Sequence, residues 1–250
     1  MIWITLYIFV LGLVLGSFYN VVGMRVADDE SIVTPRSHCP RCGHTLRSYE
    51  LIPVFSYLFQ KGQCRQCGMN ISPIYPFFEA LTGGLFVFAF FHIGFHIELF
   101  LAWLFISLLV IITISDWYKQ LIPDRILVAF ALIIIAWRIW MPTDPWYDGY
   151  LAALLGFGLL LLIAIVSRGG MGGGDIKLFA VLGLFLGVEK TLLTLMLASV
   201  IGTVIGLALM GLGLVEKGKP IPFGPFIASG ALVAYFYGDS LINWYLSLML

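Results

Sequence analysis

The sequence has 250 residues and no formal net charge; 60% of its residues are hydrophobic and only 11% are charged. Ordinary soluble domains carry about 25% charged residues, so this composition excludes a typical soluble protein. Apolar runs of about 18 to 24 residues recur, and such runs can cross a hydrocarbon core about 30 Å thick. The sequence has no basic patch with interleaved aromatic residues, which argues against nucleic acid as a partner. We therefore predict an all-α protein that spans a lipid bilayer several times.

Eight membrane helices are predicted from the apolar runs and the polar breaks between them. The first run has no basic residue before it and is longer than a signal-peptide core, so we expect it to be a retained helix. The sixth run is short and contains glycine. In chain order the expected helices are Ile2–Met24, Ile74–Phe91, Leu99–Ser115, Ile122–Trp140, Tyr150–Val166, Ile176–Val188, Thr191–Val215 and Phe223–Tyr245.

The distribution of Lys and Arg predicts an orientation, because these residues favour cytoplasmic loops. With the N-terminus outside, 12 of the 14 basic residues face the cytoplasm, and only Arg138 and Lys190 lie outside. Trp140 and Trp146 fit an aromatic belt at the outer surface. The cytoplasmic edge then holds the polar segment 25–73, the end of the third helix and the loop before the sixth helix.

The polar segment 25–73 contains all four cysteines, in two pairs: Cys39 and Cys42, then Cys64 and Cys67. Two CxxC pairs separated by 21 residues are typical of a structural zinc site with tetrahedral geometry. Disulfides or redox-active dithiols are the alternative, but thiols on the cytoplasmic side stay reduced. His38 or His44 could replace one cysteine ligand. A polar segment of this length has little core, and a bound metal can stabilise it.

Asp116 stands out among the few acidic residues near the membrane helices. It closes the third helix, where the helix dipole already places partial negative charge, so local structure gives no reason for a carboxylate there. An exposed pair with Lys119 would contribute little. Asp124, in contrast, follows Pro123 at the start of a helix, where an acid is common. We therefore select Asp116 over Asp124 as the functional carboxylate.

The second selected carboxylate, Asp175, follows five glycines in the six positions from Gly169 to Gly174. Asp175 could be the N-cap of the sixth helix, but an N-cap does not need this glycine run. The run is not a dinucleotide fingerprint, because Met171 breaks the G-x-G-x-x-G spacing and no strand precedes it. Glycines at a membrane edge would instead let an extended peptide approach closely.

Two aspartates at one membrane edge suggest an acid–base pair. Paired carboxyl groups do not both ionise cheaply, so one stays protonated while the other is charged. The charged one can activate a water for attack on a peptide carbonyl, and the neutral one can protonate the leaving amine. The sequence does not say which aspartate has which role. An ion-coupled transporter is the alternative, although transporter sites lie near the midplane of repeated helices; a scaffold protein would leave Asp116 unexplained.

An ordered series of motifs in this chain resembles the type IV prepilin peptidase family, whose members are GxGD aspartic membrane proteases and N-methyltransferases. The cysteine pairs belong to this series, and the resemblance spans residues of about 12 to 225. The other matching segments are Gly16-Ser17-Phe18-Tyr19-Asn20-Val21-Val22 with Arg25, Tyr75-Pro76-Phe77-Phe78-Glu79, Asp116, Ile122-Pro123-Asp124, and Gly172-Gly173-Gly174-Asp175-Ile176-Lys177.

The resemblance implies that Asp116 and Asp175 are the catalytic pair and that the four cysteines hold structural zinc. It implies cleavage of a basic leader from prepilin or pseudopilin precursors at the cytoplasmic edge of a bacterial inner membrane. S-adenosylmethionine would then donate a methyl group to the new N-terminus. Phe223-Gly224-Pro225 is similar to the form that serves competence pseudopilins in Gram-positive bacteria. Another GxGD protease is the closer alternative, but the cysteine pairs point away from it.

Two parts are expected on the same resemblance: residues 1–95, with the first two helices and the zinc segment, and residues 96–250, the peptidase part. The N-terminal part is linked to methyl transfer in the family. The candidate residues there are Asn20, Arg25 and Glu79, each of which could equally be a buried polar residue used in packing. The substrate is expected to approach along Gly172, Gly173, Gly174 and Lys177. The oligomeric state does not follow from the sequence.

Overall fold

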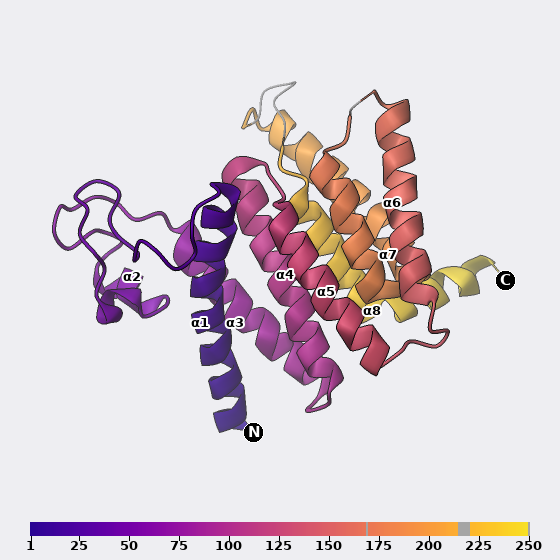
Figure 1. Ribbon diagram of the computed structural model, residues 1–250, viewed down its shortest axis with the longest axis horizontal. Helices are drawn as coiled ribbons and strands as arrows, with labels where there is room; N and C mark the ends of the chain where they lie inside the picture. The colour runs from indigo at the N-terminus through magenta and orange to yellow at the C-terminus, as the bar shows by residue number, and fades with distance from the viewer. Residues whose placement is uncertain (169, 215–220, 250) are drawn as a thin grey trace. The chain divides into compact units, whose positions relative to one another are not determined.

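The computed structural model describes residues 1–168, 170–214 and 221–249, without the side chain of residue 249. These residues form helices and loops, with two isolated β-bridges and no strand among them. They group into two compact units, Met1–Ser115 and Asp116–Leu250 (Figure 1). The helices are α1 (Ile2–Ala27), the 3₁₀ turn η1 (Ser48–Leu51), α2 (Phe55–Phe59), α3 (Ile74–Ile93), α4 (Glu98–Lys119), α5 (Asp124–Trp140), α6 (Asp148–Val166), α7 (Gly173–Gly211) and α8 (Gly224–Met249).

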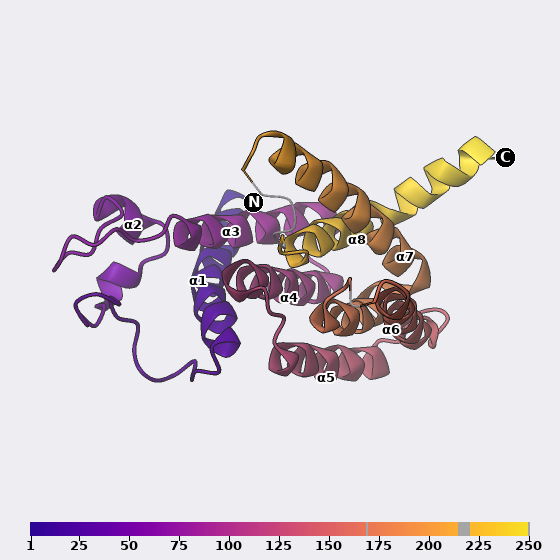
Figure 2. The same ribbon diagram turned by 90° about the horizontal axis from the view of Figure 1, so that it is seen from above.

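The first unit is built on the close packing of α1 against α3. A Cβ on Gly12 would lie only 2.7 Å from the Cα of Gly83, and a Cβ on Gly16 would lie 2.9 Å from the Cα of Glu79. Small residues at such a seam let two membrane helices approach closely. The hydroxyl groups of Tyr19 and Ser107, 2.6 Å apart, join α1 to α4. The segment between α1 and α3 forms a lobe beside these helices (Figure 2).

The second unit is organised around α7, which packs against α5, α6 and α8. At 1.5 Å per residue, its 39 residues would extend about 58 Å, far more than a hydrocarbon core of about 30 Å. The helix is broken at Gly187, whose φ of 76° and ψ of 175° are not helical. Glycine is suited to this position because a residue with a side chain would be strained at that φ.

Two charged side chains stabilise the break in α7. Arg138 donates to the carbonyl oxygens of Leu184 and Phe185, at 3.0 and 2.7 Å, at the end of the first half of the helix. Asp148 accepts from the backbone N–H of Val188, at 3.3 Å, at the start of the second half. Each charge therefore complements the dipole of the helix end that it contacts. The sequence predicted only that Arg138, near the end of the fourth expected helix, lies on the outer side.

The prediction of an all-α membrane protein is confirmed. By length and composition, six of the described helices can cross a membrane: α1, α3, α4, α6, α7 and α8. The expected sixth and seventh helices form the two halves of α7, with the break at Gly187 before the polar pair Glu189–Lys190. The fourth expected helix is α5, which has 17 residues. Eight crossings stay a prediction, and Gly169, Val215, Lys217 and Lys219 lie outside the described residues.

Candidate metal centre and candidate active site

The two cysteine pairs lie in two turns of the same design. In each turn the glycine after the second cysteine donates its N–H to the carbonyl of the first: Gly43 to Cys39 and Gly68 to Cys64, both at 2.9 Å. Both glycines have positive φ values, 70° and 68°, which this turn requires and which glycine adopts without strain. An isolated bridge closes each turn, His38 with Thr45 and Gln63 with Asn70. The repeated turn explains why each CxxC pair is followed by glycine.

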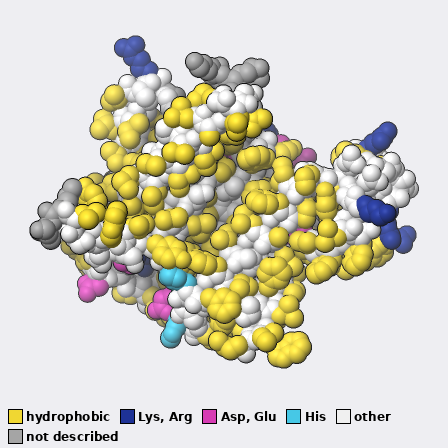
Figure 3. Space-filling view, turned by 180° about the vertical axis from the view of Figure 1, so that it is seen from behind, with side chains coloured by type: hydrophobic (Ala, Val, Ile, Leu, Met, Phe, Trp, Pro, Cys, Tyr) yellow, Lys and Arg dark blue, Asp and Glu magenta, His cyan; other side chains and the backbone are white. Residues whose placement is uncertain are grey.

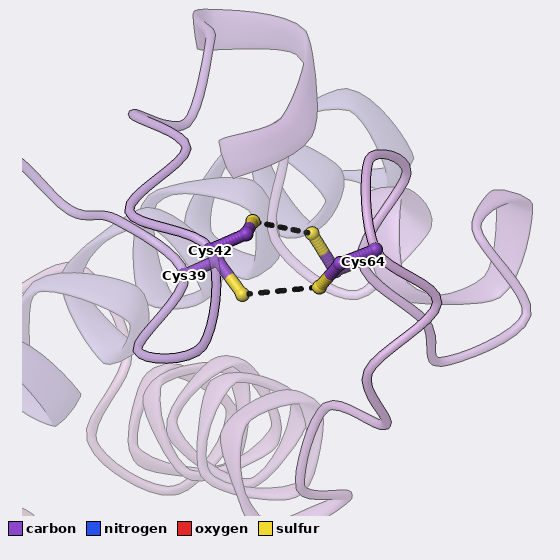
Figure 4. A group of neighbouring side chains, drawn as sticks. Cys39, Cys42 and Cys64 are labelled. Carbon is purple, nitrogen blue, oxygen red and sulfur yellow. Dashed lines mark hydrogen bonds between the residues drawn. The ribbon is translucent and has the colours of Figure 1, made fainter.

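The four sulfur atoms of these turns converge on one point (Figure 4). All four Sγ atoms lie within 4.8 Å of one another. Across the two turns, Cys39 Sγ is 3.7 Å from Cys67 Sγ, and Cys42 Sγ is 3.9 Å from Cys64 Sγ. This arrangement can bind a metal ion with four thiolate ligands, as the sequence predicted.

Ionisation of the cysteines also favours a bound cation. Backbone N–H groups of Cys42 and Arg41 lower the pKa of Cys39 to about 6. The backbone N–H of His44 lowers the pKa of Cys42, but desolvation and the neighbouring thiols outweigh it and raise that pKa to about 11. When no cation is present, the negative charge of one thiolate therefore disfavours ionisation of the next cysteine. A metal ion removes this opposition, because ligand thiols bind in their deprotonated form.

Neither histidine of the segment joins the sulfur cluster. His38 Nδ1 lies 3.0 Å from the carbonyl oxygen of Arg36, and His44 Nε2 lies 3.1 Å from Glu50 Oε2. The carboxylate of Glu50 also accepts the Arg47 N–H at 2.8 Å, and its side chain is only 1% exposed. The Arg47 N–H holds the pKa of Glu50 below its ordinary value, against the opposing effect of burial. Glu50 thus braces the first cysteine turn from inside the lobe.

The three polar candidates of the N-terminal part lie on or near the α1–α3 seam. Asn20 donates to the carbonyl of Tyr75 at 3.2 Å, and its own oxygen is buried without a hydrogen-bond partner among the described residues. Glu79, one turn further along α3, accepts the N–H of Val54 at 2.7 Å and so joins the cysteine lobe to this helix. Arg25 lies nearer the lobe and donates to the carbonyl of Ser31 at 3.0 Å.

Asp116 lies in the last turn of α4 and is buried, with 6% of its surface exposed. Its Oδ2 accepts the backbone N–H of Gly224 at 2.7 Å. Gly224 is the first residue of α8, so the carboxylate binds one of the free N–H groups at a positively polarised helix end. This donor compensates for the unfavourable position of Asp116 at the end of α4. The sequence did not predict it, although Phe223-Gly224-Pro225 marked a helix start.

Asp175 lies in the first turn of α7 and is half-buried. Gly172, and not Asp175, is the N-cap residue of this helix. A Cβ on Gly172 would lie 3.0 Å from Asp175 Oδ2, so the carboxylate folds back over its own helix start. The charge of Asp175 also interacts with the charge of Asp116.

The other residues expected near Asp175 have distinct surroundings. Lys177 Nζ lies 2.7 and 2.8 Å from the two carboxylate oxygens of Asp124, in an exposed ion pair between α7 and α5. A Cβ on Gly174 would lie 2.8 Å from the Cβ of Ile122, so packing alone excludes a side chain there. A Cβ on Gly173 would meet nothing within 4 Å among the described residues. Open space beside the helix start is therefore found at Gly173.

Comparison with known proteins gives two family matches. Residues 10–93 match the bacterial peptidase A24 N-terminal domain, and residues 103–207 match the type IV leader peptidase family. The chain is 46% identical, over 243 residues, to the prepilin leader peptidase/N-methyltransferase of Bacillus subtilis (strain 168), covering 97% of this chain and 98% of the relative. It is 33% identical over 277 residues to the Aeromonas salmonicida (strain A449) protein of the same name, covering 97% and 94%. No solved structure matches.

Proposed function

This chain belongs to the type IV leader peptidase family, and on that basis we propose that it removes the leader peptide from prepilin or pseudopilin precursors and then methylates the new N-terminus. The relatives over nearly the whole chain carry both activities in their names. The precursor and S-adenosylmethionine are the two substrates of this proposal. In this proposal, residues 1–95 carry methyl transfer and the metal site, and residues 96–250 carry cleavage.

Cleavage is assigned to Asp116 and Asp175. The observation that carries this assignment is the position of Asp116, which is buried and accepts the N–H of Gly224. Asp175, its proposed partner, lies in the first turn of α7. One carboxylate is ionised and takes a proton from water, whose oxygen attacks the scissile carbonyl carbon. The other is protonated and donates to the carbonyl oxygen as it gains charge. The C–N bond then breaks, and the amine leaves with a proton from the pair.

The leader junction is expected to lie along Gly172 and Gly173, where a Cβ on Gly173 would meet open space. Gly174 contributes by packing on Ile122. Lys177 keeps the start of α7 against α5 through its ion pair with Asp124. Both aspartates are placed at the cytoplasmic edge of the inner membrane, with the N-terminus outside, on the distribution of Lys and Arg.

Zinc is the proposed ion of the four-cysteine site. A tetrahedron with zinc–sulfur bonds of about 2.3 Å has sulfur–sulfur edges of about 3.8 Å. The distances of 3.7 and 3.9 Å between the two cysteine turns fit this value. Four protein ligands leave no open coordination position, so the ion cross-links the lobe and takes no part in chemistry. Metal analysis should give one zinc per chain, lost when both cysteines of one pair are replaced by serine.

Methyl transfer moves a methyl group from the sulfonium of S-adenosylmethionine to the new terminal amine, which loses a proton. Asn20, Arg25 and Glu79 are the candidate residues. Asn20 has the one feature that suggests a ligand, because its buried oxygen has no partner among the described residues. An amine or amide N–H would satisfy this acceptor.

The test is incubation of the purified protein with a synthetic precursor and methyl-labelled S-adenosylmethionine, followed by mass spectrometry. Cleavage should disappear in Asp116→Asn and in Asp175→Asn. Asp239→Asn is the matched control, because Asp239 is exposed and pairs with Lys190 away from both aspartates in sequence. Persistent cleavage in either of the first two variants would exclude the proposed pair. Cleavage without label transfer would exclude the methylation half only.

A further inference from the structure

The cysteine lobe carries an exposed apolar surface that neither the metal site nor cleavage uses. Within residues 51–59, five large hydrophobic side chains face outward, with exposed fractions from 40% to 85%: Leu51, Ile52, Phe55, Leu58 and Phe59. We call these five residues the lobe patch. Phe59, at 85%, is the most exposed of them. Exposed apolar side chains grouped in one short segment in this way indicate an interaction surface.

Beyond the exposed acids Asp28, Asp29 and Glu30, which directly follow α1, the exposed charges of the lobe are all positive. Between residues 31 and 73 the basic side chains are all exposed: Arg36, Arg41, Arg47, Lys61 and Arg65. The single acidic residue of this range is Glu50, which is buried and already accepts the Arg47 N–H. Arg47 and Lys61 flank the patch on either side in sequence. Residues 31–73 therefore present apolar and cationic groups together, which matches an anionic lipid surface.

The depth of the lobe patch follows from one hydrogen bond. Val54, in the middle of the segment, donates its N–H to Glu79 at 2.7 Å. Glu79 is the sixth residue of α3, so this contact lies about 7.5 Å along the helix from Ile74. Since α3 is one of the membrane-spanning helices, the segment lies beside its first turns and not beyond its end. Interfacial segments insert to a similar depth, about 5–10 Å.

The figures agree with this depth. In Figure 1, α2 lies at a height between the two ends of α1, beside this helix and not beyond its end. The view from above also places the lobe beside the α1–α3 pair (Figure 2). In Figure 3, hydrophobic side chains line the lower edge of the lobe, with Lys and Arg side chains beside and above them. An apolar lower edge and a basic upper side are what a segment lying in the headgroup region presents.

We propose that the lobe patch docks the cysteine lobe onto the anionic phospholipid surface of the membrane that α1 and α3 cross. Both ends of the lobe continue into these helices, so the lipid surface is always within reach. Docking would fix the metal-bound lobe relative to the membrane plane and leave the exposed guanidinium and ammonium groups among the headgroups. A protein partner is the competing occupant, and the test below separates it from lipid.

Hydrogen exchange of the full-length, metal-loaded protein in lipid nanodiscs tests this docking. Exchange at residues 51–60 should be about five- to thirtyfold slower in phosphatidylglycerol-rich nanodiscs than in pure phosphatidylcholine, since one or two basic side chains at an anionic surface contribute that factor. The double variant Leu58→Ser/Phe59→Ser should lose this protection. Its matched control, Ile32→Ser/Val33→Ser, replaces two exposed apolar residues of the same lobe outside the patch and should keep it.

Three results would overturn the proposal. The first is equal exchange in the two kinds of nanodisc. The second is protection that survives in the Leu58→Ser/Phe59→Ser variant. The third is protection that develops only after a second protein, such as the precursor, is added. Zinc content measured on the same samples shows whether the variant lobe is folded. The readout does not involve cleavage, so it stands or falls separately from the proposed peptidase activity.

Discussion

Gly224→Ala is the substitution that most directly tests how Asp116 is held. A Cβ at position 224 would lie 2.8 Å from Oδ2, 3.1 Å from Cγ and 3.0 Å from Cβ of Asp116. Favourable contacts between carbon atoms need about 3.5–4.0 Å. Rotating the carboxylate would not relieve the contact with the Asp116 Cβ. Either α8 or the end of α4 must therefore move by about 0.5–1 Å, which is the difference between the favourable separation and the 3.0 Å between the two Cβ atoms.

The size of the effect follows from that displacement. Overpacking of this kind reduces the free energy of unfolding by about 1–3 kcal/mol. A catalytic group misplaced by about 1 Å can lower the rate by about a hundredfold. The move also lengthens the 2.7 Å hydrogen bond from Gly224, which leaves Asp116 without its backbone donor. We expect kcat for precursor cleavage to fall by about ten- to a hundredfold, with a smaller change in KM.

Gly158→Ala in α6 is the matched control for Gly224→Ala. A Cβ there would meet nothing within 4 Å among the described residues. Alanine should stabilise this helix by up to about 1 kcal/mol and leave cleavage unchanged. Steady-state cleavage and thermal unfolding are measured on both variants in the same detergent. Wild-type kcat together with wild-type thermal stability in Gly224→Ala would refute the close contact on which this reasoning depends.

Three further predictions concern Glu50 and the break in α7. Glu50→Gln should speed zinc release to a chelator by about 10- to 100-fold, the range for residues that support metal ligands; the exposed Glu30→Gln should not, and equal rates would contradict the bracing role. The Arg47 N–H lowers the pKa of Glu50 in the folded lobe. The ionised Glu50 should therefore stabilise the lobe fully above its ordinary pKa of 4.5, and this contribution should be lost as the pH falls through the lower pKa of the folded state. An unchanged midpoint of acid unfolding in Glu50→Gln would contradict this prediction. Arg138→Gln should lower the free energy of unfolding by about 3 kcal/mol, because two charge-assisted hydrogen bonds to carbonyls are lost. Denaturant unfolding measures this change, and a value below about 1 kcal/mol would refute the prediction.

The metal centre was predictable because its information is local. Each cysteine turn closes on itself through a glycine N–H, and the spacing of the two pairs is visible in the sequence. Asp116 was also selected from the sequence, because a carboxylate at the C-terminus of a helix lies in an unfavourable local field. What the sequence did not supply was the group that relieves this conflict. The Gly224 N–H is 108 residues away, and a backbone donor has no residue type that would mark it.

The remaining omissions have the same physical origin. Glu79 binds the N–H of Val54, and Arg138 binds the carbonyls of Leu184 and Phe185. In both cases a charged side chain forms hydrogen bonds with backbone groups that have no partner within regular secondary structure. Every residue type has such backbone groups, so the sequence does not mark the partner. Sequence patterns identify the side chain but not its partner. A charged residue can therefore be structural, as Arg138 is, without looking different in the sequence from a catalytic one.

The same distinction decides how the glycines before Asp175 should be interpreted. A run of glycine suggested a single purpose, close approach of a peptide, but the individual residues differ. Gly174 has no room for a side chain because Ile122 fills the space, whereas Gly173 borders open space. Alanine at 174 should thus disturb packing between the start of α7 and the segment before α5, and lower stability and cleavage together. Alanine at 173 should leave stability unchanged and raise KM for the precursor alone. Equal effects of the two substitutions would show that the run acts as a unit.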